Sequence, residues 1–244
     1  KLFMKNFFAF LIGLLLLQFM NTHSQEVTKV KGGFKMCTTY FQMYFDGETD
    51  TKNKSSVYYF DDNGYLTHQI NEKEKNDLIT EEKETYKHDD AGNIYEITYS
   101  NRQNETWVVT SKKVNTFNES GKLAIITTYD TNGSVTSKRD FSATLKEDSI
   151  FVAKNTVVKT NSKGIKTKVY RNGESTRTTI YDIDGNKTEE TYQSKKGAKL
   201  TKDIYKYDTF GNLSEKKSYS GNELLNTVYY IYSKDTLPMP KVLK

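Results

Sequence analysis

A short turn pattern that recurs along the chain constrains its fold more than any other feature of the sequence. In each copy an aspartate is followed three residues later by a glycine, and Asn118–Gly121 is a close variant that begins with asparagine. The aspartate side chain can accept a backbone N–H two residues further on, and the glycine supplies the positive φ that a hairpin loop needs. The pattern therefore predicts β-hairpin turns at Asp61–Gly64, Asp89–Gly92, Asp130–Gly133, Asp182–Gly185 and Asp208–Gly211.

The spacing of the turn glycines indicates a repeat. Gly185 and Gly211 are 26 residues apart, and Gly133 and Gly185 are 52 residues apart, which is twice that interval. A second, interleaved series has glycines 24 residues apart each time, at Gly173, Gly197 and Gly221. One period therefore corresponds to two strands and two turns, a β-hairpin repeat.

The segments between the turns are rich in Tyr, Thr, Val and Ile, which suit a pleated sheet. Only residues 71–83 are charged and turn-poor enough to predict a loop or a short helix instead. We expect an all-β antiparallel meander of repeated hairpins that forms a bent sheet, a sandwich or a partly closed barrel. The predicted strands are Ser56–Phe60, Tyr65–Ile70, Glu84–His88, Ile94–Ser100, Thr106–Phe117, Leu123–Tyr129, Val135–Phe141, Ile150–Lys159, Ile165–Tyr170, Arg177–Tyr181, Lys187–Tyr192, Lys202–Tyr207, Leu213–Tyr219 and Leu224–Tyr232.

The composition fits a thin sheet with a modest core. After residue 24, only 43 of 220 residues are Leu, Ile, Val or Phe, a share near the level of about 20% below which highly charged chains are disordered. The same part of the chain holds all 18 tyrosines, and its net charge is only +3 once Lys1 and Lys5 are set aside. This composition excludes a helical bundle with a large aliphatic core and a membrane protein with many spans.

The first 24 residues are typical of a secretory signal peptide. Lys5 supplies a positive start, residues 7–20 supply an apolar stretch, and small and polar residues follow. We expect an exported protein of the periplasm, cell surface or extracellular space that meets a membrane only through this peptide. Residues 25–56 are an N-terminal extension or the first strands, residues 57–232 are the hairpin repeat domain, and residues 233–244 are a tail.

Three of the turns resemble the tyrosine–aspartate (YD) repeats of RHS-type proteins. The matching segments are Tyr129–Gly133, Tyr181–Asn186 and Tyr207–Leu213, and the resemblance covers roughly residues 57–232. It implies long antiparallel sheets in a secreted setting. In large members the sheets form a shell around a toxic C-terminal domain, for which this chain is too short. The resemblance therefore implies an architecture, not an activity.

Few residues are suited to metal binding or catalysis. His68 and His88 are the only histidines after the signal peptide, and the lone Cys37 reads as a strand residue. The Asp182 turn lacks the spacing of an EF-hand loop, whose glycine belongs at the sixth position, although weak calcium binding stays an alternative there. We expect no catalytic residue, no metal site and no cofactor.

The basic residues do not predict nucleic-acid binding. Only four of the 36 are arginines, at positions 102, 139, 171 and 177, and acidic residues are interleaved with the lysines. Nucleic-acid sites usually show a clustered basic face. We expect the lysines to lie on solvent-exposed faces of the strands instead.

Aromatic side chains are the weak candidates for a ligand site. They could form an exposed platform or act as core filler in place of scarce aliphatics. The residues are Tyr95, Tyr99, Trp107, Tyr205, Tyr207, Tyr230 and Tyr232.

The favoured function is an exported, non-enzymatic structural or binding module of the bacterial envelope, with a glycan or protein partner. The alternatives are a carbohydrate- or peptide-recognition module that uses an aromatic face, and a hydrolase with paired carboxylates. Any open meander also has two edge strands that can pair with a partner. A cavity of several hundred Å³ would favour a small ligand.

Overall fold

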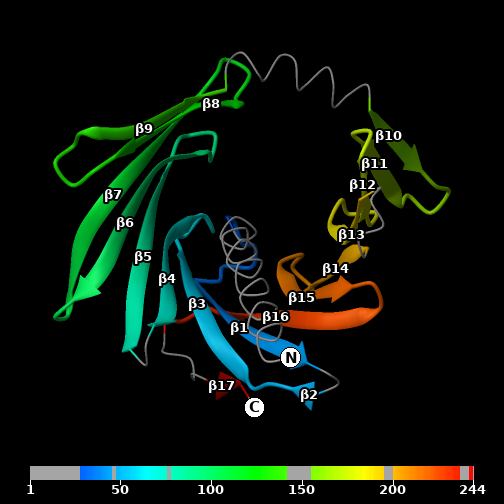
Figure 1. Ribbon diagram of the computed structural model, residues 1–244, viewed down its shortest axis with the longest axis horizontal. Coiled ribbons are helices and arrows are strands. Elements are labelled where there is room, and N and C mark those ends of the chain that lie inside the picture. The colour runs from blue at the N-terminus through cyan, green and yellow to red at the C-terminus, as the bar shows by residue number, and fades with distance from the viewer. Residues whose placement is uncertain are drawn as a thin grey trace, which may run out of the picture.

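The computed structural model describes residues 28–45, 48–75, 78–141, 155–194, 200–236 and 242–243. These ranges contain seventeen β-strands in a single sheet (Figure 1) and no helix. All the strand pairs are antiparallel, which confirms the predicted all-β meander. The predicted signal peptide lies outside the described residues. No described helix is long and apolar enough to cross a membrane.

The first long strand lies in the middle of the sheet, not at its edge. β1 (Met36–Phe45) pairs with β3 (Lys52–Phe60) on one side and with β16 (Glu223–Ser233) on the other. Two short strands, β2 (Glu48–Thr49) and β17 (Val242–Leu243), pair with β1 and β3 respectively. The first and last of the long described strands, β1 and β16, therefore lie side by side at the centre of the sheet.

The paired strands β3, β1 and β16 form a central seam. Two arms of consecutive hairpins extend from this seam. The first arm continues from β3 through β4 (Leu66–Lys75), β5 (Leu78–His88), β6 (Ile94–Gln103), β7 (Thr106–Phe117), β8 (Leu123–Tyr129) and β9 (Val135–Asp140). The second arm returns to β16 through β10 (Thr156–Thr160), β11 (Lys166–Arg171), β12 (Ser175–Tyr181), β13 (Lys187–Ser194), β14 (Thr201–Tyr207) and β15 (Leu213–Ser220). Figure 1 shows the arms curling into an open ring. Among the described residues β9 and β10 each have one partner strand, so the sheet is bent but not closed.

The recurring turns close the hairpins through a shared geometry. In the Asp182 turn, the N–H of Gly185 donates to the carbonyl oxygen of Asp182, and Gly185 has a φ of 85°. Beside the turn the strand register shifts between Ile180 and Tyr181, which leaves Thr188 of β13 as an extra, bulged residue. The Asp182 carboxylate accepts the backbone N–H and the side-chain amide of Asn186. Comparable turns with a positive-φ glycine occur at Asp61, Asp89, Asp130 and Asp208.

The prediction of a loop or short helix over residues 71–83 is wrong. Residues 71–75 belong to β4 and residues 78–83 to β5, and the two strands pair from His68↔Thr85 to Lys75↔Leu78. Their charges did not prevent strand formation because cations on neighbouring strands meet them. Lys54 of β3 pairs with Glu72, and Arg102 of β6 pairs with Glu81. Pairing with neighbours in space thus outweighed local composition.

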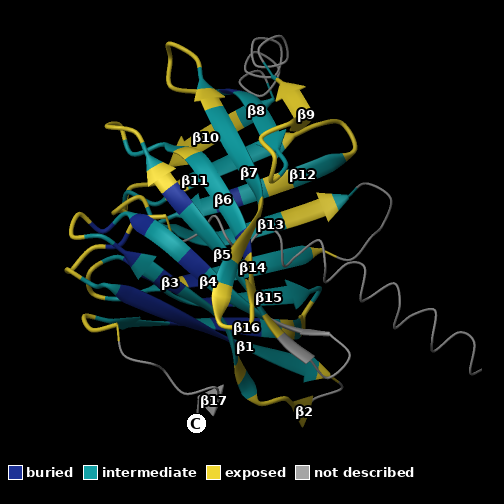
Figure 2. Cartoon of the chain, turned by 90° about the vertical axis from the view of Figure 1, so that its left-hand side faces the viewer, coloured by how far each residue is buried: buried dark blue, intermediate teal, exposed yellow. Residues whose placement is uncertain are grey.

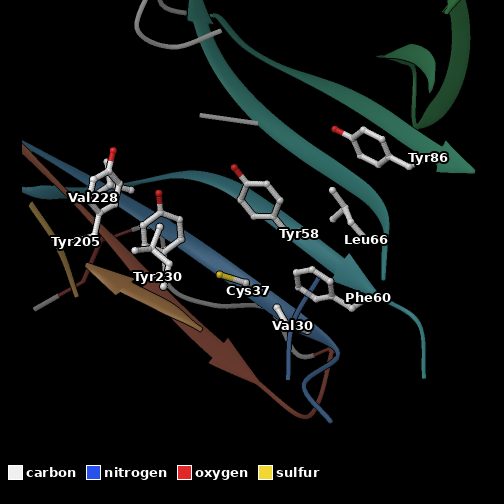
Figure 3. Close-up of a cluster of buried hydrophobic side chains, with 10 residues drawn as sticks. Val30, Cys37, Tyr58, Phe60, Leu66, Tyr86, Tyr205, Val228 and Tyr230 are labelled. Carbon is white, nitrogen blue, oxygen red and sulfur yellow. The ribbon is translucent and has the colours of Figure 1, made fainter. Parts of the chain in front are cut away.

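The main hydrophobic cluster lies on one face of the sheet, around the central seam, and the opposite face of β1 is also buried at Met36, Thr38 and Tyr40. Figure 2 shows buried residues gathered at β1, β3 and β16, whereas β9 is exposed along its length. Aromatic side chains form much of this core, which contains five tyrosine or phenylalanine residues (Figure 3). We call this side the core face, and its buried cluster comprises Val30, Cys37, Tyr58, Phe60, Leu66, Tyr86, Tyr205, Leu213, Val228 and Tyr230.

The segment of residues 28–35 crosses beside the seam and forms hydrogen bonds with both arms. The N–H of Val30 donates to the carbonyl oxygen of Gly64 in the first arm at 2.9 Å. In the second arm, the side chain of Asn212 accepts the N–H of Lys31 at 2.7 Å and donates to its carbonyl oxygen at 3.0 Å. Phe34 packs against Phe210 with ring centroids 5.4 Å apart. The seam is therefore held by strand pairing and by this crossing segment.

Candidate binding pocket on the core face

A pocket of about 360 Å³ lies on the second arm, over strands β10 to β13. This volume is within the range of about 300–1,000 Å³ that is usual for small-ligand sites. Because the pocket spans four neighbouring strands on one face, that face is hollowed there. The lining residues are Thr156, Lys168, Tyr170, Arg177, Thr179, Tyr181, Lys187 and Glu190.

The strand register explains why these side chains meet. Thr179 of β12 is opposite Lys168 of β11 on one side and Glu190 of β13 on the other. Residues directly opposite each other in a sheet share a face, and alternate residues along a strand return to it. The same face continues through Asp203 of β14, opposite Glu190, toward the buried Tyr205. The pocket and the core therefore lie on the same side of the sheet.

One carboxylate organises two of the cations that line the pocket. Glu190 accepts hydrogen bonds from Arg177 Nε at 2.7 Å and from Thr179 Oγ1 at 3.3 Å, and Arg177 also pairs with it through an NH2 group at 2.6 Å. Lys187 Nζ lies 3.5 Å from the other carboxylate oxygen. Burial alone would raise the pKa of Glu190, but Lys187 and then Arg177 outweigh it, so the pKa is lowered. Glu190 is therefore ionised and held in place.

Lys168 differs from the other cations of the pocket. It lines the pocket from β11, and no described side chain forms an ion pair with it. On the same strand, Tyr170 is opposite Arg177, and Lys166 lies over the Tyr181 ring at 5.9 Å. The pocket therefore presents, beside two tyrosine rings, an ammonium group that has no ion-pair partner within the described ranges.

A second group of charges links the pocket to the core. Lys216 of β15 is 5% exposed, and its ammonium group lies 3.4 Å from Asp203 Oδ2. Lys187 and Lys216 approach the Tyr205 ring at 4.2 Å and 5.5 Å from its centroid. These cation–π contacts help to fix Lys187, which lines the pocket and also meets Glu190.

The seven aromatic candidates do not form one exposed platform. Tyr205 and Tyr230 are buried at 5% and 3% exposure, and Tyr207 and Tyr232 pack against the core cluster. These four act as core filler because the seam has few aliphatic side chains to cover it.

The other three candidates belong to the first arm and are divided between the two faces. Tyr95 and Tyr99 share the core face of β6 with Ile97, which is opposite Tyr86. Trp107 of β7 is on the opposite face, where Lys83 lies over its ring. The register therefore excludes a platform shared by all seven side chains, which was the alternative to their packing in the core.

The remaining candidates for chemistry have structural surroundings. Cys37 is fully buried in β1, and burial raises the pKa of its thiol, with Tyr232 as a hydrogen-bond partner. His68 stacks on Tyr59 at 4.3 Å, and His88 Nε2 lies 2.7 Å from the carbonyl oxygen of Leu66. Over the described ranges, no group of three His, Cys, Asp or Glu side chains is placed to hold a metal ion.

No sequence motif marks the residues that line the pocket. A signal was present in β11, where Lys166, Lys168 and Tyr170 alternate with other residues and must share one face of a strand. The sequence does not specify which face is hollow, because that depends on how the whole sheet curls. Without the direction of the curl, the pattern is equally typical of a solvated strand face.

The chain shows weak similarity to several solved structures. A porin-like protein from Bacteroides uniformis has 11% identity and a TM-score of 0.37, over 86% of this chain and 100% of its own. A porin-like protein from Bacteroides vulgatus has 10% identity and a TM-score of 0.25, over 82% and 99%. Aeromonas veronii immune modulator A has 8% identity and a TM-score of 0.17, over 87% and 99%. Similarity at this level assigns no function.

No protein-family model and no curated protein matches the sequence. The resemblance of the turns to YD repeats therefore stays a prediction.

Proposed function

We propose that the chain is an exported, non-enzymatic binding module of the bacterial envelope and that its ligand occupies the pocket over β10 to β13. The observation that carries this proposal is the pocket itself, which combines two tyrosine rings, a fixed carboxylate and a lysine without an ion-pair partner in the described part of the chain. The signal-peptide pattern of residues 1–24 supports export.

The geometry favours binding over hydrolysis. A glycosidase needs two carboxyl groups that flank the scissile bond, one of them with a raised pKa so that it can donate a proton. Glu190 is the carboxylate among the residues that line the pocket, and its pKa is lowered. The next carboxylate along the face, Asp203, is paired with Lys216. These acids are arranged to hold cations in place.

The lining is suited to a small ring-containing ligand. Tyr170 and Tyr181 present partly exposed rings on which a sugar or an aromatic group can stack. The hydroxyl groups of the same two tyrosines can accept hydrogen bonds from hydroxyl or amide groups of a ligand. A carbohydrate or peptide segment of small size is therefore the expected ligand, bound in a pocket instead of on a flat aromatic face.

Binding to an array of oligosaccharides and short peptides tests the proposal. We expect saturable binding of at least one class, and we expect Tyr170→Leu to weaken it at least about tenfold through loss of stacking. Tyr219→Leu is the matched control, because Tyr219 is on the opposite face of β15 with Lys202 over its ring. An array without any ligand, or equal binding by the two variants, would contradict the proposal.

A further inference from the structure

We propose that the ligand of this pocket is an acidic saccharide whose carboxylate pairs with Lys168. This inference rests on the proposed binding function and adds the chemical class of the ligand. It begins with the charge of the lining, which has three cations, Lys168, Arg177 and Lys187, and one carboxylate, Glu190. The lining therefore has a net charge of +2, and Lys166 beside Tyr181 adds to it on the same face.

The three cations are not equivalent toward a ligand. Arg177 and Lys187 are already engaged by Glu190, which receives them on its two oxygens. A ligand anion would compete with Glu190 for either of them. Lys168 has no such competitor among the described residues, and its partner positions across the strands are Val158 and Thr179. Lys168 is thus the cation that is available to a ligand.

A ligand that covers Lys168 must compensate for its lost hydration. Burying a charge without a partner is costly, whereas a charge-assisted hydrogen bond to a carboxylate offsets that cost. A neutral ligand of the same shape would leave the ammonium group covered and unpaired. The pocket therefore discriminates in favour of an anionic ligand.

The other lining residues indicate a saccharide as the carrier of the anionic group. Tyr170 and Tyr181 can stack on the apolar face of a sugar ring, and their hydroxyl groups can accept hydrogen bonds from its hydroxyl groups. An acidic peptide would use the lysine but would leave the carboxylate of Glu190 close to its own acidic groups. A sugar ring with one carboxylate uses both the cation and the acceptors.

Matched pairs of acidic and neutral glycans test this inference on the full chain. The pairs are sialyllactose with lactose, oligogalacturonate with oligogalactose, and a hyaluronan tetrasaccharide with chitotetraose. Polyglutamate, inorganic phosphate and sulfate are added as separate anionic probes. Affinities are measured by calorimetry for the wild type, Lys168→Gln, and the control Lys159→Gln. Lys159 is exposed on the opposite face of β10, where it is opposite Thr167.

We expect the acidic member of at least one pair to bind at least about tenfold more tightly than its neutral counterpart. Lys168→Gln should remove that difference, Lys159→Gln should retain it, and the preference should fall as salt is added. If the acidic and neutral members bind equally well and Tyr170→Leu abolishes that binding, this inference is overturned while the proposed binding function stands. Binding of polyglutamate, phosphate or sulfate alone would overturn the saccharide class. Absence of all binding, including to the array, would overturn both proposals.

Discussion

Two glycine substitutions separate the strain of a single turn from the attachment of the crossing segment. Gly64 and Gly185 occupy the same position in their turns, with φ values of 79° and 85°. A Cβ added at Gly185 meets no atom within 4 Å. A Cβ added at Gly64 would lie closer to the carbonyl oxygen of Val30 than real Cβ atoms come to any neighbour. Alanine at Gly64 must therefore displace residues 28–30.

The magnitudes follow from these contacts. Gly185→Ala should lower the free energy of unfolding by about 1–2 kcal/mol, the cost of a left-handed conformation for an L-residue. Gly64→Ala carries the same strain and also breaks the hydrogen bonds Val30 N–Gly64 O and Leu66 N–Thr28 O, at about 0.5–1.5 kcal/mol each. We therefore expect a loss of about 2–5 kcal/mol for Gly64→Ala.

Urea and thermal unfolding measure the loss of stability, and amide hydrogen exchange measures the detachment of residues 28–30. At about 2–4 °C per kcal/mol for a chain of this size, Tm should fall further for Gly64→Ala than for Gly185→Ala. Exchange should increase at the Val30 and Leu66 amides only in Gly64→Ala. Equal losses of stability in the two variants, with both amides protected, would refute the claim that residues 28–35 link the two arms and stabilise the seam.

Two further predictions concern the seam. Cys37 should react with a thiol reagent at least about a hundredfold more slowly in the native protein than in urea, because its side chain is fully buried and the pKa of its thiol is raised. Comparable reaction rates in the two conditions would contradict its place in the core. Asn212→Ala should cost about 1–2 kcal/mol more than Asn186→Ala, since both bond to their turn aspartate but only Asn212 also bonds to Lys31. Urea unfolding of the pair measures the difference, and equal losses would count against it.

The hairpin turns were accessible from the sequence because their determinants are local. Asp182 and Gly185 act within one five-residue loop, and the hydrogen bonds of the Asp182 carboxylate do not depend on distant strands. Alternation likewise indicates which residues share a face, as it does for Lys168 and Tyr170. The all-β antiparallel class follows from this local information.

Pairings between distant residues were not accessible in the same way. β1 pairs with β16, so Cys37 lies opposite Tyr232 although the two residues are far apart in sequence. No local sequence pattern predicts this pairing. The strands over residues 71–83 form because Lys54 and Arg102 of neighbouring strands meet their acids. The pocket depends on the direction in which the sheet curls, which is a property of all the strands together.

Footprinting of lysine amines most directly tests the central claim that the core face of the second arm is the binding surface. The protein is acetylated with and without saturating acidic glycan, and the modification rate of each lysine is read by mass spectrometry. We predict protection of Lys168 in the pocket and unchanged modification of Lys159 on the opposite face of the neighbouring strand. Equal modification of Lys168 in the free and bound protein would contradict the assignment of the pocket.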